Sequence, residues 1–345
     1  MSTLKEIAQA ANVSLGTVDR VIHNRGGVSE ESEAKVKDAI RKLNYTPNIF
    51  ARQLKRKKPF YFGVLMPDPH QDGGFWERPA SGIEKAVTEL NSHRVELLPF
   101  YYNRYSHMSF SRAADKVLSA DLDGLLIAPV FTEISQEFVS KIPFSLPFVF
   151  FDTYIPQSSC LSCIMQDSFQ SGQLSARFMH LLLPEPATIA AIQVLPQDYH
   201  IAERIKGFKT YFSSYPSYQV KIDSVIREET HVDFASTIEP LLQNLPDLKG
   251  IFVSNALVFI VGRILEKNGR NEDIHLIGYD LIKQNLDCLK SGTIDFLISQ
   301  QSEQQGYQGI YTLFRHVVMQ EPVKKKIMMP IDIITRENVD YYHSP

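Results

Sequence analysis

The sequence predicts an α/β protein with two lobes, each a doubly wound parallel sheet, preceded by a small all-α headpiece. Short helical patterns fill the first 45 residues. From Pro59 onward, apolar runs of strand length alternate with helical patterns, which is typical of a parallel sheet covered on both faces. About ten such runs are too many for one small sheet of this length, so we expect two lobes.

The chain opens with two short amphipathic helices. The first begins after Thr3, which forms a T-x-x-E capping box with Glu6. Ser14 can cap the second. Apolar residues recur at helical spacing at Leu4, Ile7, Ala8 and Ala11, and again at Val18, Val21 and Ile22. A turn of about three residues between them makes a helix-turn-helix, and an ordinary helical hairpin is the alternative.

A third helix and a basic linker complete the headpiece. Ser29 caps a helix whose first turn carries Glu30 and Glu31 and whose apolar stripe is Val36, Ala39, Ile40 and Leu43. After Pro47, the residues Ile49, Phe50, Ala51 and Leu54 form a short helical pattern that is marginal alone, because isolated helices need about 12–15 residues. We expect this helix to fold only when a partner buries its apolar face.

The positive charge is gathered at one end of the chain. Residues 1–58 carry twelve Lys or Arg and six Asp or Glu, a net charge of +6, although the whole chain has a net charge of −3. Because this charge lies on a capped helical module, it is typical of a phosphate-contacting surface, whereas a solvated basic tail is the simpler alternative.

Composition excludes several classes of protein. No apolar run reaches the roughly 18 residues of a membrane helix, and the chain begins directly on a capped helix, so we expect a cytoplasmic protein without membrane contact. Cys160, Cys163 and Cys288 cannot form a paired framework, and Cys160-x-x-Cys163 has no second pair to complete a zinc site. We therefore expect plain thiols, no metal and no cofactor.

The region after Pro59 alternates between strands and helices. We expect strands at Phe60–Met66, Val95–Phe100, Gly124–Ala128, Phe148–Phe151, Thr188–Val194, Val220–Ile226, Gly250–Val253, His275–Gly278, Phe296–Ser299 and Ile331–Ile334. We expect helices near 75–91, 109–120, 168–182, 201–214, 233–244, 256–268, 281–290 and 303–320. Ligands bind such sheets beyond the carboxyl ends of the strands, and two facing lobes make a cleft there.

The residues that follow the expected strands, or open the next helix, form the candidate ligand site. They are Phe75, Trp76, Asp152, Asp167, Arg204, Asn255, Asp280 and Gln300. Carboxylates and amides hold hydroxyl groups by paired hydrogen bonds, and aromatic faces cover the C–H groups of a sugar ring, so this set suits a neutral polyol. Each also has a simpler explanation: Asp167 and Asp280 as helix caps, Asn255 as a turn residue and Trp76 as core.

The order of the headpiece elements resembles the LacI family of bacterial transcription regulators through the first 58 residues. The resemblance rests on Leu4-Lys5-Glu6-Ile7-Ala8, Val13-Ser14, Thr17-Val18, Arg20-Val21, Val28-Ser29, Asn44-Tyr45, Pro47-Asn48 and Ala51-Arg52-x-Leu54. It implies contacts with double-stranded operator DNA from Thr3, Ser14, Leu15, Gly16, Thr17, Arg20, Asn24, Asn48, Ala51, Arg52, Leu54 and Lys55. Asp19 and Gly16 depart from the usual residues, and we expect Asp19 to pair with Arg20, with a cytosine amine as its alternative partner.

The linker is expected to couple the two functional sites. In a two-fold dimer, the short helix would pair with its own copy, place Leu54 in the minor groove, and set Arg52 and Lys55 on phosphates. The alternative is a flexible basic tether that adds only charge.

Residues from about 60 to 345 resemble the type I periplasmic-binding-protein fold of the same family. The matching landmarks are Phe150-Phe151-Asp152, Asp167-x-x-x-Ser171-Gly172, Arg204-x-x-Gly207-Phe208, Gly278-Tyr279-Asp280 and Gln300 followed by Gly306. The resemblance implies that a sugar or a related small polar ligand binds between the lobes. Asn255-Ala256 replaces a common Asn-Asp, so one carboxylate of the usual set is missing, while Arg204 makes a sugar acid the second choice.

An enzyme and a pure solute-binding protein are the two alternative classes of function. The chain has no P-loop, no G-x-G-x-x-G after a strand, no G-x-S-x-G elbow and no H-E-x-x-H, so we expect no catalytic residue; a sugar-processing domain is the enzyme alternative. A pure solute-binding protein does not account for the basic headpiece.

The sequence therefore predicts a homodimeric DNA-binding transcription regulator under the control of a sugar effector. Its expected parts are a headpiece at 1–45, a hinge and linker at 46–58, and an effector domain at 59–345. Within that domain, we expect one lobe at 59–162 and 300–321 and the other at 163–299 and 322–345.

Overall fold

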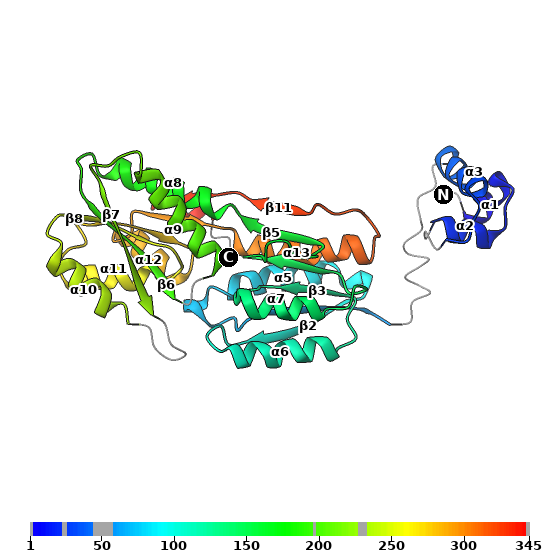
Figure 1. The fold of residues 1–345 in the computed structure, drawn as a ribbon, viewed down its shortest axis with the longest axis horizontal. Helices are drawn as coiled ribbons and strands as arrows, with labels where there is room; N and C mark the ends of the chain where they lie inside the picture. Colours follow the sequence, from blue (N-terminus) through cyan, green and yellow to red (C-terminus); the bar gives the residue numbers. More distant parts are fainter. Residues whose placement is uncertain (1–2, 23–25, 44–57, 196–197, 227–232, 343–345) are drawn as a thin grey trace. The chain divides into compact units, whose positions relative to one another are not determined.

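The structure is a computed structural model that describes residues 3–22, 26–43, 58–195, 198–226 and 233–342. The chain divides into two compact units, Met1–Lys58 and Pro59–Pro345, which are described separately below (Figure 1).

The described residues of the smaller unit form three helices, α1 (Leu4–Ala11), α2 (Leu15–Ile22) and α3 (Glu30–Lys42). The capping box is confirmed: Thr3 N donates to Glu6 Oε2 at 2.8 Å, and Glu6 N donates to Thr3 Oγ1 at 3.3 Å. Asn12 takes a left-handed conformation, with φ of 51°, and ends α1. The buried core of this unit is Ile7, Ala11, Val18, Val36 and Ala39. These residues come from all three helices, so α1, α2 and α3 pack together around one small core.

The larger unit contains two six-stranded sheets. The first has the order β11-β5-β4-β3-β1-β2, with β1 (Phe60–Pro67), β2 (Val95–Tyr102), β3 (Gly124–Ile127), β4 (Phe148–Phe151), β5 (Ser162–Gln166) and β11 (Lys326–Met329). The second has the order β12-β10-β9-β8-β6-β7, with β6 (Thr188–Leu195), β7 (Gln219–Ile226), β8 (Leu248–Val253), β9 (His275–Tyr279), β10 (Phe296–Ser299) and β12 (Asp332–Ile334). All neighbours are parallel except the pair β10 and β12. The predicted fold class is confirmed.

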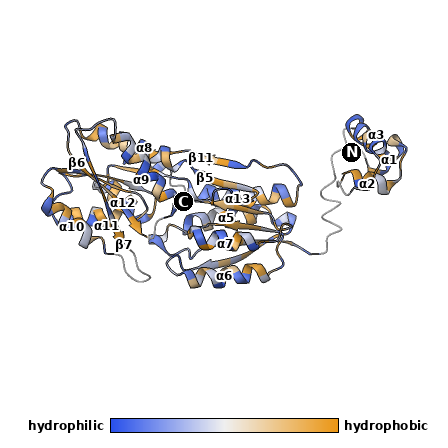
Figure 2. Cartoon of the chain, viewed as in Figure 1, coloured by the Kyte–Doolittle hydropathy of each residue, from blue (hydrophilic) through white to orange (hydrophobic). Residues whose placement is uncertain are grey.

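Helices cover both sheets (Figure 1). They are α5 (Glu77–Glu89), α6 (His107–Ser119), α7 (Thr132–Lys141), α8 (Ser168–Leu182), α9 (Tyr199–Phe212), α10 (Ala235–Asn244), α11 (Val258–Lys267), α12 (Lys283–Ser291) and α13 (Ser302–Val317). Short 3-10 turns lie at η1 (Asp72–Gly74), η2 (Asn91–His93) and η3 (Val339–Tyr341). Helix α13 packs on α5 and on β3 and β4, so it belongs to the first lobe. Apolar residues gather along the sheets, as expected for strands buried on both faces (Figure 2).

The expected lobe boundaries are corrected at two strands. Strand β5 pairs with β4, and β11 pairs with β5, so both belong to the first lobe and not to the second. Neither strand was expected. The sequence of β5, Ser-Cys-Ile-Met-Gln, has polar ends, and β11 begins at the last of three lysines at 324–326, so neither reads as a buried apolar run.

The chain therefore crosses between the lobes at three places: between β5 and α8, between β10 and α13, and between β11 and β12. One side chain links all three crossings. Gln166 Nε2 donates to Ser299 O at 3.0 Å and to Pro330 O at 2.8 Å. Because Gln166 ends β5, its amide fixes the relative positions of the crossing segments.

The structure also bears on membrane helices and on the three cysteines. Among the described residues, no helix is long and apolar enough to cross a membrane. All three cysteines are buried and free.

Candidate functional site

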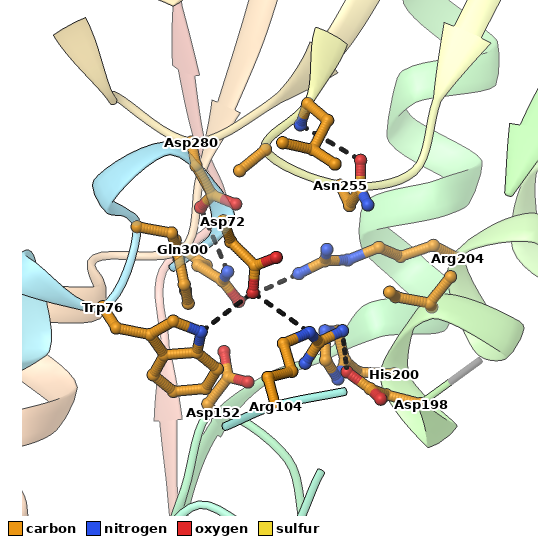
Figure 3. A pocket seen from close by; sticks show the side chains of 14 residues that line it. Asp72, Trp76, Arg104, Asp152, Asp198, His200, Arg204, Asn255, Asp280 and Gln300 are labelled. Carbon is orange, nitrogen blue, oxygen red and sulfur yellow. Dashed lines mark hydrogen bonds and ion pairs between the residues drawn. The ribbon is translucent and has the colours of Figure 1, made fainter. Parts of the chain in front are cut away.

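A cavity of about 340 Å³, part of which opens to solvent, lies where the carboxyl ends of strands from both sheets meet (Figure 3). Its walls are Asp72, Phe75, Trp76, Arg104, Asp152, Asp198, His200, Ile201, Arg204, Asn255, Ala256, Leu257, Asp280 and Gln300. Seven of the eight expected ligand residues line it: Phe75, Trp76, Asp152, Arg204, Asn255, Asp280 and Gln300. The expectation that strand-end side chains converge holds for these seven.

The first-lobe wall is built around Trp76, the one tryptophan of the chain. Its side chain is buried, and Nε1 donates to Asp72 Oδ2 at 2.9 Å. The Phe75 ring meets it edge-on, with centroids 4.9 Å apart. Asp72 also accepts from the Tyr105 hydroxyl, so both of its carboxylate oxygens are engaged within this lobe. Trp76 is therefore core and cavity wall at the same time, because one face packs inward while the indole N–H is held at the cavity.

Asp152 stands on the same wall directly after β4. Its backbone is left-handed, with φ of 67°, and its N–H donates to Gln305 Oε1 at 2.8 Å. This bond to α13 holds a conformation that is uncommon for a residue other than glycine. The result is a buried carboxyl group aimed into the cavity (Figure 3).

The second-lobe wall is organised by Arg204 on α9. Its Nη1 donates to Ser254 O and its Nη2 to Gln300 Oε1, both at 2.9 Å, and the guanidinium lies 3.8 Å from the centre of the Tyr279 ring. Gln300 Nε2 in turn donates to Asp280 Oδ1 at 3.0 Å. Hydrogen bonds thus join the side chains of Arg204, Gln300 and Asp280 into one row of polar groups.

The structure decides most of the simpler explanations. Asp280 is not a helix cap, because Ile282 holds the N-cap position of α12. Asn255 does act as a turn residue, since its Oδ1 accepts from Leu257 N at 3.1 Å, and it lines the cavity as well.

Asp167 is the one expected ligand residue that does not line the cavity. It is exposed and caps α8, accepting from Gln170 N at 3.0 Å. The simpler explanation of Asp167 as a helix cap therefore holds, and a capping aspartate looks the same in the sequence as a cavity aspartate after a strand.

Four polar residues of the cavity were missed in the sequence: Asp72, Arg104, Asp198 and His200. A usable signal existed, because Arg104 follows β2 by two positions, and Asp198 and His200 follow β6 as the other site residues follow their strands. The rule that found Asp152 finds these too when it is applied to every strand.

Five buried polar atoms of the wall have no hydrogen-bond partner among the described residues. Arg104 Nε and Asp198 Oδ2 are engaged in ion pairs, which leaves Asp152 Oδ1, His200 Nδ1 and Arg204 Nε. Buried polar groups are nearly always paired in native structures, so unpaired ones gathered at a single cavity indicate a bound polar molecule. Both acceptor and donor groups are present, which matches the two-way hydrogen bonding of a hydroxyl group.

Burial governs the protonation of this site. It raises the pKa of Asp152 to about 7, partly opposed by Arg204, and raises the pKa of Asp280 to about 6. Burial also lowers the pKa of His200 well below its usual value, and the positive charges of Arg204 and Arg104 act in the same direction. His200 is therefore neutral at pH 7, and Asp152 is close to half protonated.

We expect the stability of the larger unit to fall as the pH rises towards 7. The folded protein keeps the Asp152 proton, while the unfolded chain releases it near pH 3.9, so the stabilising effect is full at low pH and is lost as the pH passes the folded pKa. The slope is at most about 1.4 kcal/mol per pH unit for one proton. Urea unfolding of wild type and Asp152→Asn at pH 6, 7 and 8 measures it.

The quantity to compare is the pH slope of the unfolding free energy in wild type and in Asp152→Asn. His200 changes this slope in the opposite direction below its ordinary pKa of about 6.5, but it is present in both proteins, so its effect is common to both. Asp280 also loses stabilising effect as the pH rises, and because its folded pKa is about 6, this loss is complete only about one pH unit higher. An equal pH slope in wild type and Asp152→Asn between pH 6 and 7 would show that Asp152 does not carry the proton.

The exposed face of α2 carries the residues expected to read DNA. Leu15, Gly16 and Arg20 are exposed, and Thr17 is half-buried. The Ser14 and Thr17 hydroxyls lie 2.9 Å apart, and Ser14 Oγ accepts from Thr17 N at 3.1 Å, so Ser14 caps the helix as expected. Six other expected DNA contacts lie outside the described residues: Asn24, Asn48, Ala51, Arg52, Leu54 and Lys55.

Comparison with known families decides the assignment. Residues 62–321 match the family described as periplasmic binding protein domain, and residues 3–48 match the bacterial regulatory proteins of the lacI family. The chain belongs to the lacI family of bacterial regulatory proteins. The larger match covers most of the chain, and the smaller one covers the helix-turn-helix unit, so this lacI-family protein is a transcription regulator built from both parts.

Curated relatives agree over the whole length. The chain is 25% identical to the ribose operon repressor of Lactococcus lactis over 351 aligned positions, covering 98% of both proteins. Over a shorter region, 37% of this chain and 39% of the relative, it is 35% identical to catabolite control protein B of Bacillus subtilis.

Solved structures resemble the larger unit. A Bacteroides fragilis protein assigned to the LacI transcriptional regulators superposes with a TM-score of 0.78 at 29% identity, covering 83% of this chain and all of that one. A solute-binding protein of Agrobacterium radiobacter in complex with D-arabinose gives a TM-score of 0.71 at 20% identity, covering 82% of this chain and 97% of that one. At this identity, the second comparison supports the fold of this lacI-family protein and nothing further.

Replacing Arg20 should relax the base preference of the lacI-family headpiece. We expect Arg20→Ala to cost about 1–3 kcal/mol at one operator base pair, because an arginine on the exposed face of α2 is placed to contact a base edge in the major groove. Binding to a set of single-base operator variants measures it. Lys35→Ala is the control, since Lys35 lies on α3 in an exposed pair with Glu31. An unchanged profile for Arg20→Ala would remove it from the reading surface.

Proposed function

We propose that this protein is a homodimeric repressor-type regulator whose operator binding is controlled by a neutral monosaccharide held in the cavity. The observation that carries the proposal is the set of unpaired buried polar atoms beside Trp76, placed among the fixed row Arg204, Gln300 and Asp280. This arrangement offers hydrogen bonds in several directions and an aromatic wall for C–H groups.

Charge favours a neutral sugar over a sugar acid. The cavity holds four carboxyl groups, two guanidinium groups and a neutral histidine, so it offers no excess of positive charge to a carboxylate. Both Nη atoms of Arg204 are already bonded, which leaves only Nε for a ligand. A carboxylate is best held by two parallel bonds from one guanidinium, and Arg204 cannot provide them here. A uronate therefore stays the second candidate.

The name of a full-length relative favours a single sugar ring. The relative in Lactococcus lactis that matches 98% of both chains is named for a ribose operon, which agrees with a monosaccharide ligand.

The remaining parts of the proposal follow from the headpiece. One three-helix unit reads about one half of an operator, so two copies related by a two-fold axis are needed for a full site. Because the target is chromosomal DNA, we place the protein in the cytoplasm. The raised pKa of Asp152 and that of Asp280 are explained by burial at a binding site, so we assign no catalytic role to either.

The coupling of the two sites is assigned to residues 46–58. Ligand binding that changes the arrangement of the lobes changes the separation of the two linker ends in a dimer, and so changes the free energy of pairing the short helices.

A thermal-shift screen of neutral monosaccharides, disaccharides and uronates tests the ligand class. The bound sugar at about 100 times its Kd should stabilise the protein by roughly 2.7 kcal/mol. Asp280→Ala should abolish this shift. Stabilisation by uronates alone would overturn the neutral-sugar proposal, and no shift with any sugar would overturn the sugar effector.

A further inference from the structure

One side chain of the cavity wall makes charged contacts with both lobes. Arg104 follows β2 in the first lobe, and its N–H donates to Gln71 Oε1 at 2.8 Å. Its Nε lies 3.0 Å from Asp72 Oδ2 in the same lobe, and its Nη2 lies 2.8 Å from Asp198 Oδ2 in the second lobe. Figure 3 shows the guanidinium between these two carboxylates.

The bridge is buried. The Arg104, Asp72 and Asp198 side chains are 11%, 12% and 5% exposed. In such surroundings, the attraction between opposite charges is screened little by water or salt. Both contacts are ion pairs by distance, although neither Arg104 Nε nor Asp198 Oδ2 makes a hydrogen bond of good geometry.

The two ends of the bridge are anchored differently. Asp72 belongs to the first lobe, where its oxygens also accept from Trp76 and Tyr105. Asp198 starts α9 in the second lobe, where its carbonyl accepts from Ile201 N and Ala202 N, both at 3.1 Å. Separation of the lobes therefore leaves the contact to Asp72 intact and breaks the contact to Asp198.

Apolar contacts lie beside the bridge. A Cβ atom built on Gly73 would lie 3.0 Å from Ile282 Cδ1 and 3.5 Å from Phe259 Cε1, so the η1 turn of the first lobe touches the second lobe closely. Arg78 Nη1 also donates to Leu281 O at 3.4 Å. The ionic bridge therefore acts on lobes that already fit against each other.

We propose that Arg104 and Asp198 form an electrostatic latch that holds the lobes closed in the absence of ligand. Arg104 and Asp198 are positioning residues, since they act through the arrangement of the lobes. The consequence for ligand binding rests on the proposed function: in such a regulator, the ligand binds to lobes that the latch already holds closed. If loss of the latch lowers the closed share of the protein to about a tenth, the apparent Kd for the ligand rises about tenfold.

The built-in reporter of closure is Trp76. It is the one tryptophan of the chain, and it lies in the cavity wall with its side chain 1% exposed. Opening of the lobes exposes this ring to solvent. Acrylamide quenching of its fluorescence, measured on the full-length protein without any sugar, therefore reports the latch directly.

We expect Asp198→Asn to raise the acrylamide quenching constant and the radius of gyration of the ligand-free protein above those of wild type. Asp198→Glu, which keeps the carboxylate, should restore values near wild type. Glu203→Gln is the matched control: it removes a carboxylate from the same helix, but Glu203 pairs with Lys206 inside the second lobe. Arg104→Gln should open the lobes like Asp198→Asn, and the double variant should open them no further, because both changes break one contact.

Quenching of Asp198→Asn and Arg104→Gln equal to wild type would overturn the latch. Equal opening by Glu203→Gln would also overturn it, since the effect would then belong to general charge loss. Should Asp198→Asn fail to fold, Arg104→Gln decides the question by the same measurement. The readout needs no ligand, so a wrong ligand assignment leaves this test unaffected.

Discussion

Replacement of Arg204 by methionine should destabilise the larger unit by about 3–5 kcal/mol and abolish the response to ligand. The guanidinium is 1% exposed, bonds Ser254 O and Gln300, and stacks on Tyr279. Its removal leaves Gln300 Oε1 without its donor and takes away the positive charge that opposes the raised pKa of Asp152 and that of Asp280. Urea unfolding and the sugar thermal shift measure the two effects.

Arg263→Met is the control for Arg204→Met. Arg263 is exposed on α11, with its guanidinium 5.1 Å from the centre of the Phe259 ring. Its loss should change the free energy of unfolding by no more than about 0.5 kcal/mol. A loss below about 1 kcal/mol for Arg204→Met would contradict a buried guanidinium that bonds Ser254 O and Gln300.

Gly172→Ala should destabilise the larger unit by an amount near the upper end of roughly 1–3 kcal/mol. A Cβ atom at Gly172 on α8 would lie 2.0 Å from Arg204 O on α9, and a Cβ atom at Gly207 would lie 2.1 Å from Phe169 O. Neither carbonyl can turn away without loss of its helical bond, so the two helices must separate. Because Arg204 sits at this contact, we also expect weaker ligand binding, which the thermal shift detects.

Gly16→Ala is the control for Gly172→Ala, because it adds the same Cβ atom at a helical glycine that has space for it. The nearest atom to a Cβ there is Ser14 Oγ at 3.8 Å, and alanine is the better helix former by roughly 1 kcal/mol. We expect no destabilisation by Gly16→Ala. Similar unfolding free energies for Gly172→Ala and wild type would mean that α8 and α9 are not in close contact.

The fold was largely predictable because its periodicities are local. Strands such as Phe148–Phe151 are continuous apolar runs, and the capping box of Thr3 and Glu6 lies within one turn of helix. Strands β5 and β11 were not predicted because both are mixed in polarity, and β11 lies largely exposed at the edge of its sheet. Because these two strands were missing from the predicted set, the expected lobe boundaries were misplaced.

The candidate site was predictable where one rule applied, that side chains after parallel strands meet at one edge. This rule placed Asp152, Asp280 and Gln300 correctly at the cavity. It could not separate Asp167, which caps a helix, from a cavity residue. The rule also could not predict that Arg104 pairs with Asp198. That contact depends on how the two lobes meet, and the spacing of residues in the sequence does not indicate it.

The central claim is that a sugar in the cavity changes the affinity of the headpiece for operator DNA. Fluorescence anisotropy with DNA from upstream of the protein's own gene tests it, using the sugar that gives a thermal shift. In wild type, we expect the sugar to change the operator Kd by about 5- to 150-fold. In Asp280→Ala, we expect the same operator Kd with and without sugar. A sugar that stabilises the wild type yet leaves its operator Kd unchanged would contradict the claim.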